Sequence, residues 1–229
     1  MHERIVLITG ASSGIGRALA LRLAGSARLA LVARRGDRLA DLAALITARG
    51  GQSLAIPADL AAPGGPEAAV SAVEQAWGRI DAVVNNAGLL RGDDAAGGIE
   101  AQVAINLAAP VRLIAAALPA LRRSRGCIIN VSSLAAVRVY QGCGIYSATK
   151  AGLEAWSRCL REEQRSAGIR VCVVAPGSVD TAFWEGGDAA FRSSICSPDD
   201  IARCIAFCLD LPPTMAVEHL VVAPVQPAG

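Results

Sequence analysis

Short runs rich in β-branched residues alternate along the chain with alanine-rich segments whose composition is typical of helices. Several of the short runs are continuously apolar, as expected for parallel strands that are buried on both faces. We therefore expect strands at residues 5–9, 29–33, 53–57, 82–85, 127–131, 170–175 and 219–223.

The segments between these strands predict helices that begin near Gly14, Asp37, Pro66, Ile99, Tyr146 and Pro198. Repeated strand–helix units imply right-handed crossovers. The predicted fold class is therefore α/β, with a Rossmann-like doubly wound parallel sheet of about seven strands and helices on both faces. The intervals hold no linker or repeat, so residues 1–229 should form one domain. Residues 91–98 and 180–197 are expected to be loops, and the second is a candidate mobile lid over a substrate.

Composition narrows the possible partners. The formal net charge is +2 and the basic residues are scattered, which argues against a nucleic-acid or membrane surface. An apolar strand begins within four residues of the start, so we expect no signal peptide. We also expect no membrane span, because Arg112 and Pro119 interrupt the longest apolar run. The seven cysteines lack a CxxC pair, so we expect a reduced, cytoplasmic protein without a metal.

The first predicted strand is followed at once by a glycine-rich turn, Gly10-Ala-Ser-Ser-Gly14-Ile-Gly16, and then by a helix. Glycines let the backbone approach a pyrophosphate, which the free N–H groups of a helix N-terminus attract. The spacing is looser than GxGxxG, but its position after the first strand predicts nucleotide binding.

The end of the second predicted strand bears on the choice of cofactor. An acidic residue there would bond a ribose 2′-hydroxyl, but this chain has Ala33 followed by Arg34 and Arg35. Arginine binds a phosphate through charge-assisted, bidentate hydrogen bonds. We therefore predict NADP(H) rather than NAD(H), with Arg34, alone or with Arg35, on the 2′-phosphate.

Lys150 is the only lysine in a chain that has 22 lysine and arginine residues. It follows Tyr146 by four positions, which places both side chains on one face of a helix. An ammonium beside a phenol favours the phenolate, so we expect Lys150 to lower the pKa of Tyr146. The pair reads as a general acid/base.

Taken together, the motifs resemble the short-chain dehydrogenase/reductase family, in its NADP(H)-preferring branch. The resemblance runs from the first strand to at least Thr181, and its specificity lies in the joint order of short motifs. These are Thr9-Gly10-Ala-Ser-Ser-Gly14-Ile-Gly16, Asp59-Leu60, Asn85-Asn86-Ala87-Gly88, Asn106, Ser133, Tyr146-x3-Lys150 and Pro176-Gly177-Ser-Val179-Asp-Thr181.

The resemblance implies a set of cofactor contacts. Asp59 and Leu60 would bind the adenine, although Asp59 could equally cap a turn. Asn86, Ala87 and Gly88 would allow the adenosine ribose to approach, and a structural asparagine turn is the alternative. The remaining implied contacts come from Ser12, Ser13 and Ile15 in the glycine-rich turn, from Tyr146 and Lys150, and from Pro176, Gly177, Val179 and Thr181 after the sixth strand.

The resemblance also implies the chemistry, which is hydride transfer between a nicotinamide and a carbonyl or alcohol of a small-molecule substrate. Tyr146 would exchange the proton, Ser133 would help to bind the substrate oxygen, and Lys150 would also bond the nicotinamide ribose. Asn106 would hold a water that links Lys150 to solvent, or would bond helix backbone at a bend. Alternatives are an epimerase, a double-bond reductase or a non-catalytic NADP(H) sensor.

The sequence also suggests roles for some of the aromatic residues and for His219. Tyr140 lacks a lysine at helical spacing, which favours a pocket or packing role, and Phe183 and Trp184 are candidates for the substrate pocket. His219 is expected to be packed or solvated, without a catalytic role.

Family members usually pair through the helices that here begin near Ile99 and Tyr146, so we expect a homodimer or homotetramer. Burial within one chain would explain the same apolar residues.

Overall fold

The computed structural model describes residues 3–91, 98–181, 183 and 188–225. Trp184 and residues 92–97 of the first predicted loop lie outside this part of the chain. The strands are β1 (Arg4–Thr9), β2 (Ala27–Ala33), β3 (Gln52–Pro57), β4 (Ala82–Asn85), β5 (Cys127–Val131), β6 (Arg170–Pro176) and β7 (His219–Val222). The helices are α1 (Gly14–Leu23), α2 (Gly36–Ala48), α3 (Gly65–Trp77), α4 (Gly98–Val103), α5 (Ala109–Ser124), α6 (Gly144–Gln164), α7 (Ala189–Ser194) and α8 (Pro198–Asp210).

The seven strands form one parallel sheet in the order β3-β2-β1-β4-β5-β6-β7. The chain builds the sheet outward from β1 to β3, then returns to the other side of β1 to place β4. This reversal between β1 and β4 is the point at which doubly wound sheets leave a crevice beyond their strand ends. The predicted fold class is confirmed.

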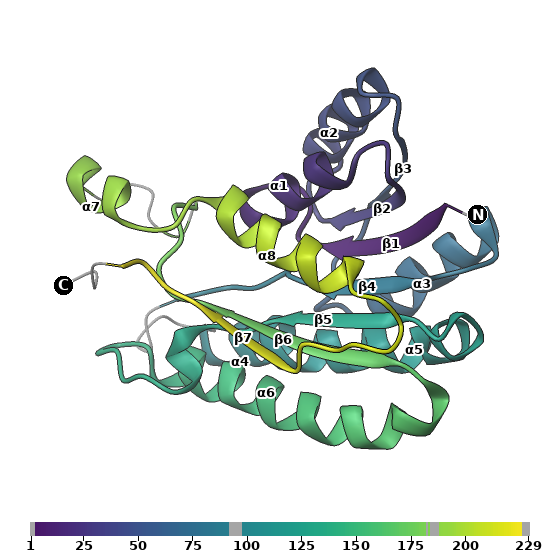
Figure 1. The fold of residues 1–229 in the computed structure, drawn as a ribbon. Coiled ribbons are helices and arrows are strands. Elements are labelled where there is room, and N and C mark those ends of the chain that lie inside the picture. The colour runs from purple at the N-terminus through teal and green to yellow at the C-terminus, as the bar shows by residue number, and fades with distance from the viewer. Residues whose placement is uncertain (1–2, 92–97, 182, 184–187, 226–229) are drawn as a thin grey trace.

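Helices cover both faces of the sheet (Figure 1). Helices α1, α2 and α8 bury one apolar cluster against it, and α3, α5 and α6 bury the other. Every second residue of a strand faces the same side. In β1, for example, Val6 and Ile8 enter the first cluster, whereas Ile5 and Leu7 enter the second.

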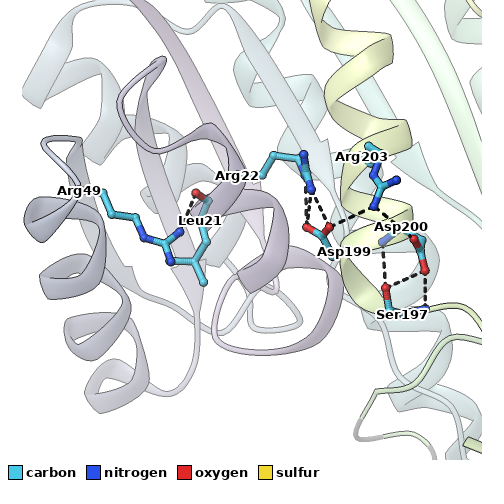
Figure 2. A network of polar contacts seen from close by, with 7 residues as sticks. All are labelled: Leu21, Arg22, Arg49, Ser197, Asp199, Asp200 and Arg203. Carbon is cyan, nitrogen blue, oxygen red and sulfur yellow. Dashed lines mark hydrogen bonds and ion pairs between the residues drawn. The ribbon is translucent and has the colours of Figure 1, made fainter. Parts of the chain in front are cut away.

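Helices α1 and α8 are joined by a polar network that Figure 2 shows from close by. The Arg22 guanidinium donates two hydrogen bonds from Nη2 to the Asp199 carboxylate, at 2.7 and 2.6 Å. Helix α8 begins with a capping box, in which Ser197 and Asp200 each bond the other's backbone N–H. Because Arg22 lies in the last turn of α1, the Arg22–Asp199 pair joins the C-terminal end of α1 to the start of α8.

The structure corrects two expectations about local structure. Part of the predicted loop at 180–197 is helical, because Asp188 caps α7 by accepting a hydrogen bond from the Ala190 N–H at 3.2 Å.

The second correction concerns the apolar run that Pro119 was expected to interrupt. The helical segment Gly98–Ser124 is long and apolar enough, by length and composition, to cross a membrane. Pro119 lies inside helix α5 and does not interrupt it. One face of this segment is buried on the sheet and α3, where it is a core helix.

Candidate active site

A cleft of about 710 Å³ opens along the carboxyl ends of β1 to β6. It spans the point where the strand order reverses, so both halves of the sheet contribute to its walls. The walls include the predicted site residues Gly10, Ser12, Ser13, Gly14, Ile15, Arg34, Arg35, Asp59, Leu60, Asn86, Ala87, Gly88, Ser133, Tyr146, Lys150, Pro176, Gly177, Val179 and Thr181. Gly16 and Asn106 are predicted site residues that lie outside the lining.

Two glycines of the turn make room for a close approach of backbone to backbone. A Cβ atom added to Gly10 would lie 3.0 Å from the backbone Cα of Ala87, and one on Gly16 would lie 2.5 Å from the Gly10 carbonyl oxygen. Gly10 also has a φ of 67°, which only glycine adopts without strain. Gly16 thus allows α1 to pack closely on the turn, and the residues just before Gly16 line the cleft.

Thr9 ties the turn to the end of β4. Its Oγ1 accepts hydrogen bonds from the backbone N–H groups of Asn86 at 2.9 Å and Ala87 at 3.0 Å. The Asn86 side chain donates back to the Thr9 carbonyl at 2.9 Å. Asn86 therefore has the structural role that the sequence left open, and its predicted ribose contact stays a prediction.

The end of the cleft beside β2 and β3 carries both positive and negative charge. Arg34 and Arg35 are exposed in its wall, and Arg35 Nη2 donates to the hydroxyls of Ser12 and Ser13, each at 2.9 Å. Asp59 is also exposed, and its carboxylate accepts a hydrogen bond from the Ala61 N–H at 3.0 Å. The turn-cap role of Asp59 is thus observed, while its adenine contact stays a prediction.

The first turns of α6 carry Tyr146 and Lys150, two of the four residues predicted to be catalytic. Lys150 is buried, and its Nζ donates to the Val131 carbonyl at 2.9 Å and lies 5.7 Å from the centroid of the Tyr146 ring. Ser133 follows β5 in extended conformation, and its Oγ accepts a hydrogen bond from the Ala135 N–H at 3.1 Å. The three side chains therefore meet in one part of the cleft, as the sequence predicted.

We expected Lys150 to lower the pKa of Tyr146. In the protein without substrate or cofactor the pKa of Tyr146 is raised instead, so this expectation is wrong. Burial raises the pKa of the Tyr146 phenol, and its hydrogen bond with Ser133 lowers the pKa by less. Burial also lowers the pKa of the Lys150 ammonium to about 8. Desolvation disfavours the charged form of each group, and it outweighs the attraction that the sequence spacing suggested.

Asn106 lies behind the cleft, in the π-helical turn Ala104–Ala108 that joins α4 to α5. Its side chain accepts from the Leu89 N–H and donates to the Leu89 carbonyl, both at 2.8 Å, and donates to Thr149 Oγ1 at 3.2 Å. Asn106 thus bonds backbone of the loop that follows β4, and not the helix backbone that was the alternative to its water-holding role. The water-holding role stays a prediction.

Sequence reasoning missed most of the apolar wall near Tyr146. This wall consists of Leu89, Leu90, Ala101, Ile105, Leu134, Cys143 and two aromatic residues, Tyr140 and Phe183. Tyr140 and Phe183 are 41% and 49% exposed, so each still offers apolar surface at the cleft. The sequence favoured a pocket or packing role for Tyr140, and it left a pocket role or a plain core or surface role open for Phe183. The aliphatic residues carried no motif, because they come from three separate segments of the chain.

The fold and this cleft define a doubly wound α/β protein with a ligand site at the reversal of its strand order. Residues 4–189 match the model of the short chain dehydrogenase family. The chain is 31% identical over 234 residues to an uncharacterized oxidoreductase of Staphylococcus saprophyticus, covering 98% of this chain and 99% of the relative. It belongs to the short chain dehydrogenase family of oxidoreductases.

Solved structures agree with this assignment. The alcohol dehydrogenase of the archaeon Thermococcus sibiricus, complexed with 5-hydroxy-NADP, is similar with a TM-score of 0.90 and 29% identity over 98% of both chains. A short chain dehydrogenase from Burkholderia cenocepacia, in complex with NADP, has a TM-score of 0.88 and 34% identity over 96% of both chains. Levodione reductase has a TM-score of 0.87 and 28% identity over 97% of both chains.

Proposed function

We propose that this protein is an NADP(H)-dependent oxidoreductase that interconverts a carbonyl group and an alcohol on a small molecule with an apolar body. The observation that carries the proposal is the position of Tyr146, Lys150 and Ser133 in the same cleft as the glycine-rich turn. A single cleft can then hold a dinucleotide at one end and place its reactive end beside a proton donor.

The residues present fit NADP(H). The turn from Gly10 to Gly16 brings backbone close to the cleft, where N–H groups at the start of α1 suit a pyrophosphate. Arg34 and Arg35 suit a 2′-phosphate, and Ala33 takes the place where an acid would bond a 2′-hydroxyl. The NADP found in similar solved structures supports the same choice.

When bound, the cofactor supplies or accepts a hydride, and the protein handles the oxygen and its proton. Ser133 and Tyr146 hold the substrate oxygen between two hydroxyl groups, where negative charge develops during reduction. Because its pKa is raised, the Tyr146 phenol is protonated at neutral pH and donates its proton to that oxygen. The Lys150 ammonium stabilises the phenolate that remains.

The wall near Tyr146 supports an apolar substrate body. Its described residues are aliphatic or aromatic, apart from the Cys143 thiol, and Ser133, Tyr146 and Lys150 lie in the same cleft. An apolar pocket with a few convergent polar groups binds an apolar molecule and fixes its orientation. We also propose a homo-oligomer that acts in the cytoplasm, without a nucleic-acid or membrane partner; the scattered basic residues support the last point.

Substitution of Tyr146 by Phe tests the proposal. Loss of the proton donor should reduce kcat for NADPH-dependent reduction of apolar ketones and aldehydes by about 10²- to 10⁴-fold, with NADPH binding largely retained. The measurement is NADPH absorbance across a substrate panel that also contains activated alkenes, with binding followed by NADPH fluorescence.

Tyr140→Phe is the matched control, because Tyr140 lines the same cleft without a lysine at helical spacing. It should retain most of the reductase activity. Turnover by Tyr146→Phe at the wild-type rate would refute the assignment, and activity confined to the alkenes would replace carbonyl reduction by double-bond reduction.

A further inference from the structure

Glu154 is a buried carboxylate on α6 that the proposed reaction does not use. Its residue exposure is 5%, and its Oε1 has no hydrogen-bond partner within the described part of the chain. A buried ionised group without compensation costs several kcal/mol, so such groups are normally paired. The position of Glu154 therefore requires a source of positive charge nearby.

Lys150 lies on the same face of α6 as Glu154, although the two side chains form no salt bridge among the described residues. The two residues are four positions apart, so their side chains lie on one face of α6, and both are buried. The Lys150 Nζ bonds only one carbonyl, that of Val131, among the hydrogen bonds of the described residues. Burial lowers the pKa of Lys150 to about 8, and the charge of Glu154 opposes that shift.

Among the described residues, His219 is the group nearest to Glu154 that can carry positive charge, and it differs from Lys150 in being partly exposed. His219 of β7 lies on the outer side, with its Nε2 3.4 Å from Glu154 Oε1 and its side chain 42% exposed. Arg158, one turn further along α6, is exposed. Arg161 is held by the Val171 and Glu218 carbonyls. On the cleft side, the titratable neighbours of Lys150 are Tyr146 and Cys143.

We propose that Glu154 is a positioning residue whose carboxylate is the buried counter-ion of Lys150 and keeps its ammonium charged inside the site. His219 closes the outer side of the pair and limits the access of water to it. The inference rests on the proposed function only for what the charged Lys150 does in the reaction. The pairing itself is a property of the protein without substrate or cofactor.

Because Lys150 is the only lysine, its charge can be measured directly. Protein grown with lysine labelled with ¹³C at Cε gives one lysine signal, whose chemical shift reports the protonation of Nζ as pH is varied. In Glu154→Gln, which removes the charge and nearly keeps the shape, the pKa of Lys150 should fall by about one unit, a tenfold loss of proton affinity. An unchanged Lys150 titration in Glu154→Gln would overturn the proposal.

Two variants separate the charge of Glu154 from other effects. Glu154→Asp keeps the carboxylate and should restore the Lys150 titration most of the way to that of the wild type. Glu162→Gln removes an exposed carboxylate on the same helix, paired with Arg165, and should leave the titration unchanged. Equal shifts in Glu154→Gln and Glu162→Gln would reduce the effect to general electrostatics and reject a specific counter-ion.

A kinetic readout follows from the same pairing. The alkaline limb of the pH profile for NADPH-dependent reduction should move to lower pH in Glu154→Gln by the shift that the Lys150 signal shows. An inactive wild-type protein would contradict the proposed function and leave the NMR result intact, so the two failures are distinguishable. A shifted Lys150 signal with an unmoved alkaline limb would remove Glu154 from the reaction.

Should Glu154→Gln fail to fold, the pairing can be tested from the other side. Lys150→Met leaves Glu154 buried without its counter-ion and should lower the melting temperature, because an unpaired buried charge destabilises the fold. The double variant Lys150→Met/Glu154→Gln removes both charges and should regain most of that loss. A double variant that melts no higher than Lys150→Met would overturn the proposal.

Discussion

Arg34 and Arg35 are neighbours in sequence, yet their side chains have different surroundings in the cleft. Arg35 donates to the hydroxyls of Ser12 and Ser13 and so helps to shape the glycine-rich turn. Arg34 is exposed in the cleft wall, and the structure shows no hydrogen bond from its side chain within the described residues. Arg34 is therefore free to engage a phosphate, whereas Arg35 also has a structural task.

This difference predicts how each arginine affects the choice of cofactor. Arg34→Ala should raise the KM for NADPH roughly 10- to 100-fold, the effect of losing a hydrogen bond to a charged group. Its KM for NADH, which lacks the 2′-phosphate, should hardly change. Arg35→Ala should weaken both cofactors, because the turn binds the part they share. Steady-state kinetics with each cofactor decide the matter, and an equal loss for both in Arg34→Ala would contradict the NADP(H) preference.

At the scale of single elements, helix α8 depends on its capping box. Ser197 Oγ accepts a hydrogen bond from the Asp200 N–H at 3.2 Å, and Asp200 Oδ2 accepts from the Ser197 N–H at 2.9 Å. Ser197→Ala should lower the free energy of unfolding by about 1 kcal/mol, measured by urea denaturation. Asp199→Asn breaks the exposed pair with Arg22 (Figure 2) and should cost less. The reverse order would show that the α1–α8 pair outweighs the cap.

The sequence located the strands closely, because continuous apolar runs identify buried parallel strands. Strands β4 and β5 begin and end as predicted, and β2 begins two residues earlier than expected, at Ala27 rather than 29. Helix α7 was missed because its six residues carry no apolar periodicity. The helix near Ile99 was expected, but the sequence did not reveal that it continues through a π-helical turn and past Pro119 to Ser124.

Motif order also brought most of the candidate site together correctly, because most of the motifs follow strand ends on the same edge of the sheet, while Tyr146 and Lys150 lie on α6. The motifs could not show which site residues are buried, or how burial changes their properties. Spacing alone suggested that Lys150 lowers the pKa of Tyr146, whereas burial of the phenol reverses the direction. Glu154 also carries no motif, and it became a candidate only once its burial and lack of a hydrogen-bond partner were known.

At the scale of the whole molecule, the outer face of α6 is a candidate contact surface between two copies of the chain. The helix turns one side to the sheet and presents Ala148, Ala151, Ala155 and Cys159, all exposed, on the other. Small side chains let two helices approach closely, and a closed dimer would bury the same face of both copies. Burial within one chain, the alternative to an oligomer, is observed for Ala117, Ala120 and Leu121 of α5, and the oligomer stays a prediction that this outer face of α6 supports.

Ala155→Arg should therefore separate the assembly, because two guanidinium groups would be buried and would repel each other across a symmetric contact. Size-exclusion chromatography with light scattering should give a wild-type mass of two or four times 23.4 kDa and a lower mass for Ala155→Arg. Glu163→Arg, an exposed charged position further along α6, is the control and should assemble like the wild type. A wild-type mass of 23.4 kDa would refute the oligomer, and an unchanged assembly of Ala155→Arg would place the contact on another face.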